Sequence, residues 1–330
     1  MKQPEYQGRG WALHNSDCIE GMWAMPEESV DCAVFSPPFG DLFVYSDSER
    51  DLGNAGEGQS FMDQYKYFAE AITRVMRKGR MVCVHCTDLP TRKGKHGYIG
   101  LQDFSGDLIK AHTDAGLIYH GRATIWKDPV VEMQRTKALG LLYKQIRKDS
   151  VMNRVGMPDY MLFFRKDGDN PNRIEHVAPG DTDGAAKIAS KWVENMHRSG
   201  LASKPPSAEL MAELVKHIEF DVYEWQRLAS PVWMDIDQGD VLNDFRAARA
   251  ENDEKHVCPL QLGVIERCLR LYSKPDDVVM DPFNGVGSTG YQALKMLRRY
   301  VGFELKPEYA KQAGKNLAAA EQSLGSLFDI

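Results

Sequence analysis

The sequence lacks the long apolar runs and the excess of positive charge that mark several protein classes. No run of about 18 apolar residues occurs and the mean hydropathy is −0.44, which excludes a transmembrane helix. No apolar segment typical of a secretory signal follows the first residues, so we expect a soluble, cytoplasmic protein. The net charge is −6, from 41 basic and 47 acidic residues. This balance argues against a protein coated in positive charge, but a local basic surface for nucleic acid stays open.

Cysteine is also scarce. The six cysteines are too scattered for a disulfide framework: Cys18, Cys32, Cys83, Cys86, Cys258 and Cys268. Cys83 and Cys86 form a C-x-x-C pair around His85, but no second pair has the spacing of a zinc site. Their segment, MVCVHC, is typical of a buried strand. We therefore predict core thiols and no metal site.

Strand and helix patterns alternate along most of the chain, which predicts an α/β fold. The expected strands cover 30–35, 81–86, 117–126, 159–164, 278–281 and 300–303, and the expected helices cover 61–78, 103–115, 185–196, 207–218 and 259–272. Gly79 is expected to end the helix over 61–78. The turn-rich segment 167–172 predicts a boundary, and the less regular region 167–254 is interpreted as a smaller appended region.

The most informative segment is the glycine-containing loop from Asp281 to Thr289, DPFNGVGST, which follows an expected strand and begins a helix. In that context glycines let a ligand approach the backbone, and the helix N-terminus offers free N–H groups. Glu304 ends the next expected strand 23 residues after Asp281, a spacing typical of an acid that binds ribose hydroxyls. The loop lacks the Gly-Lys-Ser/Thr ending of a P-loop. It therefore predicts a nucleoside-type cofactor, with Asp281 accepting from a cationic amine.

A second segment, Ser36-Pro37-Pro38-Phe39, ends the expected strand over 30–35. Pro38 has no N–H and restricts Pro37 to extended geometry, so the Pro37 carbonyl is expected to stay outside regular pairing. That carbonyl and the Ser36 hydroxyl would form a two-acceptor clamp for an –NH2 group, and Phe39 would offer a flat face to an aromatic ring. The alternative is a strand that simply ends at two prolines, with Phe39 in the core.

Taken together, these motifs resemble the DNA amino-methyltransferases of the β-class motif order. That family carries a (D/N/S)-P-P-(Y/F/W) motif early and an F-x-G-x-G motif near the C-terminus, and this chain has both in that order. Further matches lie at 14–22, 74–80, 125–127, 160–166 and 256–261. The resemblance implies a Rossmann-like methyltransferase sheet with helices on both faces. It also implies a catalytic half over 1–166, a target-recognition region over 167–254 and a cofactor-binding half over 255–330.

The resemblance implies S-adenosylmethionine as the cofactor. Asp281 and the loop after it would hold the methionine part, with help from Pro259; the loop residues are Phe283, Asn284, Gly285, Gly287, Ser288 and Thr289. Glu304 would bind the ribose, and Asp17, with Cys18 beside it, would contact the adenine. The predicted catalytic residues are Ser36, Pro37, Pro38 and Phe39.

The expected reaction is direct methyl transfer to the exocyclic amine of a base flipped out of double-stranded DNA. Ser36 is commoner among cytosine-N4 members and Asp among adenine-N6 members, yet either amine can donate to Ser36, so the base stays open. An RNA or protein-amide methyltransferase, or a catalytically silent DNA-binding regulator, is the alternative. Neither a partner restriction enzyme nor a solitary role is indicated, and a homodimer is suggested by the resemblance alone.

A basic segment is the candidate for contacts with DNA phosphates, which would place the protein on the nucleoid. The segment 122–154 contains three acidic and eight basic residues. The basic residues are Arg122, Lys127, Arg135, Lys137, Lys144, Arg147, Lys148 and Arg154. Tyr45, in the polar segment 40–60, is a candidate to stack on the flipped base. The region 166–255 is acidic, with eleven basic and eighteen acidic residues, which does not favour phosphate contacts there.

Overall fold

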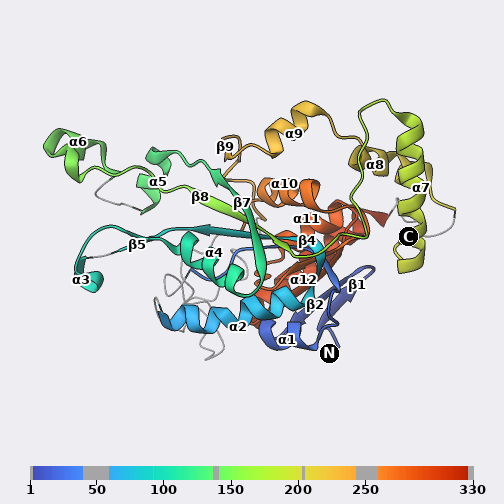
Figure 1. The fold of residues 1–330 in the computed structure, drawn as a ribbon, viewed down its shortest axis with the longest axis horizontal. Helices are drawn as coiled ribbons and strands as arrows, with labels where there is room; N and C mark the ends of the chain where they lie inside the picture. Colours follow the sequence, from blue (N-terminus) through green and yellow to red (C-terminus); the bar gives the residue numbers. More distant parts are fainter. Residues whose placement is uncertain are drawn as a thin grey trace.

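The computed structural model describes residues 3–39, 59–91, 93–136, 141–202, 205–242 and 259–325. Nine of the described strands form one sheet (Figure 1). In spatial order they are β1 (Tyr6–Gly8), β2 (Trp11–Asn15), β11 (Arg299–Glu304), β10 (Val278–Asp281), β3 (Val30–Phe35), β4 (Met76–Thr87), β8 (Asp159–Lys166), β7 (Leu117–Ile125) and β9 (Val232–Trp233). The five strands from β2 to β4 are parallel, whereas β8 runs antiparallel to both β4 and β7.

Helices cover both faces of this sheet because its central strands are apolar on both sides. Cys32 and Val34 of β3 pack in one cluster with α10 (Leu262–Tyr272), α11 (Ser288–Lys295) and α12 (Pro307–Gln322). The alternate residues Ala33 and Phe35 pack on the other side with α1 (Cys18–Ala24), α2 (Gln59–Val75) and α4 (Phe104–Asp114). Such two-sided burial is typical of parallel sheets. The predicted α/β fold with helices on both faces is confirmed.

Most expected elements are confirmed, but the boundary between α2 and β4 was wrong. The helix stops at Val75 and β4 begins at Met76, so Gly79 lies inside the strand instead of ending the helix. Gly79 has a φ of 70°, and a Cβ there would lie 2.7 Å from the backbone nitrogen of Asn170. The glycine thus serves a close approach of two chain segments. The strands β1 and β2 and the helix α1 were not predicted.

The region 167–254 contributes α7 (Thr182–Ser199), α8 (Ala208–Ile218), α9 (Val222–Leu228) and β9 to the described part of the chain. Helices α7 and α8 pack on each other in a separate apolar cluster, whereas β9 joins the main sheet beside β7. At the opposite end of the molecule in Figure 1 project α3 (Lys93–His96), α5 (Pro129–Thr136), α6 (Tyr143–Lys148), the short 3-10 helix over Ser150–Met152, and a small pair of strands, β5 (Leu89–Pro90) and β6 (Leu101–Gln102).

The cysteines of the described chain are free thiols. Cys32, Cys83, Cys86 and Cys268 are buried, and burial raises the pKa of Cys83 and Cys86 well above the usual value. Within the described ranges no group of three or more His, Cys, Asp or Glu side chains is arranged to hold a metal ion. Over those same ranges, the helices are all too short or too polar to span a bilayer.

A buried ion network joins β3, β4 and β10 near their amino ends. One nitrogen of Arg80 lies 3.0 Å from Asp31 and 2.6 Å from Asp277, and all three side chains are almost fully buried. Asp277 also receives the Lys274 ammonium at 2.6 Å, and the second oxygen of Asp31 accepts from the Val278 N–H at 2.9 Å. Burial opposes ionisation of Asp31, but Arg80 and Arg77 outweigh it and lower the pKa of this carboxyl.

Replacing Arg80 by Met is expected to reduce the free energy of unfolding by about 3–5 kcal/mol, because two carboxylates would stay buried without their shared cation. The loss should shrink as the pH falls below about 4, where carboxyls in the unfolded chain already bind protons. Urea unfolding at pH 7 and at about pH 3 measures both effects. The control is Lys110→Met, which breaks an exposed pair with Asp114 and should cost under about 1 kcal/mol. Equal losses for the two variants would contradict the interpretation.

Candidate functional site

The two predicted motifs meet where the strand order of the sheet reverses. β10 and β3 are parallel neighbours, with Met280 paired to Ala33, yet the next strand after β10 lies on one side and the next strand after β3 on the other. In open α/β sheets, ligands bind at such a switch point beyond the carboxyl ends of the strands, a region that we call the crevice. Asp281 ends β10 and Ser36 directly follows β3. The Thr289 hydroxyl donates to the Val34 carbonyl at 3.1 Å and ties the two motifs together.

The loop after β10 is held by its own side chains and by β11. The Asn284 side-chain oxygen accepts from the Tyr300 hydroxyl at 2.7 Å, and the Asn284 N–H donates to the Phe303 carbonyl. Gly285 and Gly287 have φ values of 52° and 89°, which favour glycine. A Cβ at Gly285 would enter open space, so the loop presents bare backbone to the crevice. Phe283 instead packs inward, with its ring 4.8 Å from that of Phe68.

Asp281 is a buried carboxyl at the floor of this loop. One of its oxygens accepts from the Phe283 N–H at 2.9 Å. Burial raises the pKa of Asp281 to about 7, despite the opposing contacts with Thr289 and the Phe283 N–H. The Ser288 hydroxyl, at the start of α11, is buried without a hydrogen-bond partner among the described residues. The loop therefore holds a buried carboxyl with a raised pKa and, among the described residues, a buried hydroxyl without a hydrogen-bond partner.

Glu304 connects this loop to the N-terminal strand β2. Its carboxylate accepts from the Gly285 N–H at 2.7 Å and from the Lys306 N–H at 2.8 Å. The Asn15 side chain, at the end of β2, donates to the Glu304 carbonyl at 2.8 Å. Asp17 follows β2 and caps α1 by accepting from the Glu20 N–H at 2.9 Å. Burial, followed by the charge of Asp17, raises the pKa of Cys18, to which Glu304 also contributes.

The Ser36–Phe39 segment leaves the sheet as predicted. Pro37 and Pro38 are buried outside regular structure, and Ser36 and Phe39 are half-buried. Among described residues no donor bonds to the Pro37 carbonyl. The Phe39 ring lies 6.1 Å from that of Phe104, edge to face, and 6.3 Å from that of His85. The Pro37 carbonyl thus lies outside regular pairing, as expected, and the role of Ser36 and Pro37 as an amine clamp stays a prediction.

Three polar side chains lie behind Ser36. His85 and Asp159 were not predicted as part of the site, and Lys127 was predicted only as a contact with DNA phosphates. The Ser36 hydroxyl lies 3.1 Å from Nδ1 of His85, and Nε2 of His85 lies 3.2 Å from one oxygen of Asp159. The other Asp159 oxygen binds the Lys127 ammonium at 2.6 Å. Burial would raise the pKa of Asp159, but His85 and Lys127 outweigh it and lower the pKa to about 2. The sequence signal available was a polar His85 inside the otherwise apolar strand 81–86.

The residues present fit S-adenosylmethionine. Its cationic amine and carboxylate would suit the buried carboxyl of Asp281 and the buried hydroxyl of Ser288, and bare backbone at Gly285 permits close approach. Glu304 lies at the edge of the same loop, next to the end of β2. Pro259, also predicted to help, lies just ahead of α10.

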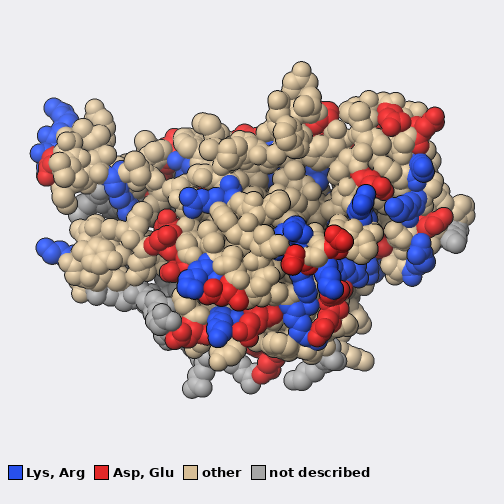
Figure 2. Space-filling model, in the orientation of Figure 1, with Lys and Arg blue, Asp and Glu red and all other residues tan. Residues whose placement is uncertain are grey.

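The predicted DNA-binding residues are spread along β7, the projecting helices and the chain after them. Lys144, Arg147 and Lys148 are exposed on α6, and Figure 2 shows basic side chains gathered at the tip of that projection. Arg122 lies over the Tyr160 ring at 5.0 Å, and Arg154 is half-buried. Lys127 instead binds Asp159. Tyr45, Lys137 and the side chain of Arg135 lie outside the described residues.

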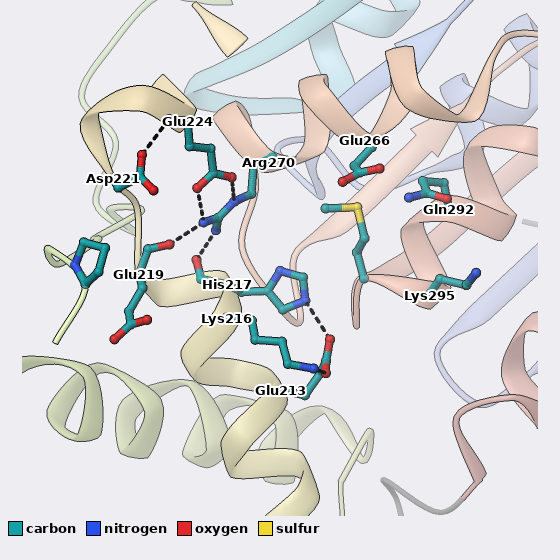
Figure 3. A pocket seen from close by; sticks show the side chains of 12 residues that line it. Glu213, Lys216, His217, Glu219, Asp221, Glu224, Glu266, Arg270, Gln292 and Lys295 are labelled. Carbon is teal, nitrogen blue, oxygen red and sulfur yellow. Dashed lines mark hydrogen bonds and ion pairs between the residues drawn. The ribbon is translucent and has the colours of Figure 1, made fainter. Parts of the chain in front are cut away.

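A separate polar cavity of about 590 Å³ lies away from the two motifs (Figure 3). Arg270 and Lys295, near the ends of α10 and α11, line it together with residues from α8 and α9. Arg270 points toward Glu224, which it binds at 2.7 Å, and toward carbonyls of the α8 end. None of the predicted site residues lines this cavity, so it is distinct from the crevice between β10 and β3.

Comparison with known proteins defines the class of enzyme. A family model for DNA methylases of the N6/N4 type matches residues 30–315. The type II methyltransferase M.Cfr9I of Citrobacter freundii is 35% identical over 321 residues, which cover 96% of this chain and 90% of that protein. M.XycI of Xanthomonas campestris pv. cyanopsidis is 23% identical over 316 residues, which cover 94% and 88%.

Solved structures share the fold. The Thermus thermophilus protein TTHA0409, complexed with S-adenosyl-L-methionine, matches with a TM-score of 0.58 and 20% identity over 93% of each chain. The cytosine-N4-specific PvuII DNA methyltransferase matches with a TM-score of 0.58 and 15% identity over 99% of this chain and 96% of its own.

The chain belongs to the N6/N4 DNA methylase family. It is a DNA amino-methyltransferase that uses S-adenosylmethionine, as the motifs predicted.

Cofactor affinity is expected to rise as the pH increases from 6 to 8, because a cationic amine binds the ionised form of Asp281, whose pKa is about 7. One pH unit below that pKa, the protonated carboxyl should weaken binding about 10-fold. Calorimetric titration with S-adenosylmethionine at pH 6, 7 and 8 measures the effect. Asp281→Asn should bind weakly and with little change over this pH range. Wild-type affinity that is independent of pH would contradict this role of Asp281.

Proposed function

We propose that the protein methylates the exocyclic amine of a base flipped out of double-stranded DNA, with Ser36, Pro37, Pro38 and Phe39 as the site that receives the base. The observation that supports this most directly is the contact between the two motifs, the 3.1 Å hydrogen bond from Thr289 to the Val34 carbonyl. It joins the loop after β10 to the strand that leads into Ser36, which supports a cofactor site next to a site for the base. S-adenosylmethionine, when bound, supplies a methyl group on a sulfonium that an amine nitrogen can attack.

The chain's own residues would act mainly by orientation. The amine of a nucleobase is a poor nucleophile because its lone pair is delocalised into the ring. Hydrogen bonds to the Ser36 hydroxyl oxygen and the Pro37 carbonyl would turn the amine towards tetrahedral geometry and aim its lone pair at the methyl group. Phe39, half-buried beside the clamp, would stack on the flipped base and exclude water from one face.

The cofactor-binding assignments follow from the same crevice. Asp281 and Ser288 would hold the amine and carboxylate of the methionine part, within the loop formed by Phe283, Asn284, Gly285, Gly287 and Thr289. Glu304 would accept from the ribose hydroxyls, and Asp17 with Cys18 would lie against the adenine. The support is the chain of contacts from Asn15 to Glu304 to Gly285, which brings the ends of β2, β11 and β10 together.

The remaining assignments concern the DNA. The exposed basic residues of α6 would contact phosphates, and region 167–254, with its separate helix pair α7–α8, would read the site between the catalytic half (1–166) and the cofactor half (255–330). The resemblance also suggests a homodimer associated with the nucleoid. Light scattering of the purified protein measures the oligomeric state.

Incubation with unmethylated DNA and S-adenosylmethionine, followed by nucleoside mass spectrometry, is expected to reveal N4-methylcytosine, since Ser36 stands where adenine-N6 members usually carry Asp. Ser36→Ala should slow methylation by about 10²-fold, because the amine loses one of its two acceptors. Thr113→Ala, which removes an exposed hydroxyl on α4, is the control and should behave as wild type. Detection of N6-methyladenine would agree with the clamp but contradict the assignment of cytosine as the target. Full activity of Ser36→Ala would contradict the clamp.

Replacing Arg147 and Lys148 together by Ala is expected to weaken DNA binding and to flatten its salt dependence. If each side chain contacts one phosphate, the slope of log K against log salt should fall by about 2. Fluorescence anisotropy at salt concentrations from about 50 to 300 mM gives both the DNA affinity and the slope. The double variant Lys311→Ala with Lys315→Ala, on exposed positions of α12, serves as the control. Identical slopes for the two double variants would reject α6 as the phosphate contact.

A further inference from the structure

Behind the clamp, strand pairing places four polar side chains in a line. β3 runs parallel to β4 with Phe35 paired to Val84, so Ser36 emerges beside His85. β4 runs antiparallel to β8 with His85 paired to Met161, which puts Asp159 diagonally across on the same face of the sheet. Lys127 follows β7, whose last residue, Ile125, is paired to Asp159. The order is therefore Ser36, His85, Asp159 and Lys127.

The distances indicate which atoms donate and which accept hydrogen bonds along this line. His85 and Lys127 lower the pKa of Asp159, which stays ionised. Lys127 binds one of its oxygens at 2.6 Å, and the other lies 3.2 Å from Nε2 of His85, within ion-pair distance but outside hydrogen-bond geometry. A carboxylate opposite Nε2 favours the tautomer that carries its proton there, which leaves Nδ1 as an acceptor. The Ser36 hydroxyl, 3.1 Å from Nδ1, then donates to His85, with the His85 carbonyl a weaker second acceptor at 3.4 Å.

This arrangement has two consequences for the clamp. The Ser36 hydroxyl proton points away from the crevice, so its lone pairs are free to accept from a bound amine. His85 and Asp159 are only 8% and 4% exposed, so water has little access to the imidazole and bulk solvent does not readily exchange its protons.

We propose that His85 takes up, through Ser36, the proton that the target amine loses on methylation, with Asp159 and Lys127 as its electrostatic support. The inference rests on the proposed role of Ser36 as the amine clamp. As the amine nitrogen forms its bond to the methyl group, the S–CH3 bond breaks and its electron pair stays on sulfur. One proton leaves the nitrogen for the Ser36 oxygen, and the Ser36 hydroxyl proton moves to Nδ1 of His85. Ser36 is regenerated, and the imidazolium is balanced by Asp159 until it loses a proton after product leaves.

His85 does not touch the substrate in this scheme and is a positioning and proton-accepting residue. His85→Gln keeps a side chain that can accept from Ser36 but cannot take up a proton. It is expected to lower kcat by about 10²-fold, with KM for DNA and the affinity for S-adenosylmethionine within about threefold of wild type. A kcat within about threefold of wild type, or a loss confined to KM, would overturn the proposal.

The matched control is His112→Gln. His112 is also a fully buried histidine, and it lies 3.1 Å from a hydroxyl, that of Tyr65. Its replacement should lower stability and leave kcat unchanged, which separates proton uptake from a general effect of removing a buried imidazole. Asp159→Asn tests the same step without altering His85: the imidazolium loses its counter-charge, and kcat should fall at least about 10-fold. Thermal melts establish that each variant is folded, and folded Asp159→Asn with wild-type kcat would overturn the proposal.

A readout that needs no activity separates this inference from the proposed function. In the cofactor-free protein, ¹⁵N NMR of labelled histidine should show His85 as the Nε2–H tautomer, and Ser36→Ala should shift its Nδ1 resonance alone. An Nδ1–H tautomer would overturn the proton path even in an enzyme that methylates DNA. Conversely, absence of any methylated nucleoside with the wild-type protein would overturn the proposed function while the tautomer still reports on the line from Ser36 to Asp159.

Discussion

Backbone hydrogen bonds between β10, β3 and β4 hold the ends of three parallel strands level with one another, and the site depends on that alignment. Asp281, Ser36 and His85 come from segments far apart in sequence, yet pairing of Met280 with Ala33 and of Phe35 with Val84 brings them to one edge. A slip of one residue in either pairing would turn the alternate side chains to the opposite face. The geometry of the candidate site is thus set first by strand register.

Buried charges are neutralised at the amino ends of the strands in this sheet but not at the carboxyl end of β10. At the amino edge, Arg80 and Lys274 neutralise Asp31 and Asp277 within a closed network. At the carboxyl edge, Asp281 is buried with no ion pair to any cation in the described part of the chain, and its raised pKa reflects that imbalance. Asp159, on a nearby strand, is by contrast supplied with Lys127. Stability and ligand chemistry are therefore separated along the strands.

Sequence patterns correctly predicted those helices, strands and loops that depend on residues close together in the sequence. The helix expected over 103–115 is α4, and the loop from Asp281 to Thr289 follows a strand and begins a helix, as predicted. Gly79 was wrongly predicted to end a helix. A glycine is required there because the backbone of Asn170, which is distant in sequence, lies too close for a Cβ. The same limit hid the link from His85 to Asp159: it needs the register of β4 against β8, and no local pattern encodes it. Short β2 gave no clear periodicity, although it carries Asn15.

The two-residue strand β9 gives region 167–254 a fixed attachment to the enzyme. Val232 and Trp233 extend the sheet beyond β7, and Trp233 is buried against Phe163 with the Arg267 guanidinium over its ring. β9 therefore covers the end of the β7 edge, at Thr124 and Ile125, where unpaired backbone groups would otherwise be open to pairing with another chain. Replacement of this region is consequently constrained: a substituted segment must bring its own edge strand and indole, or Phe163 and the end of β7 lose their cover.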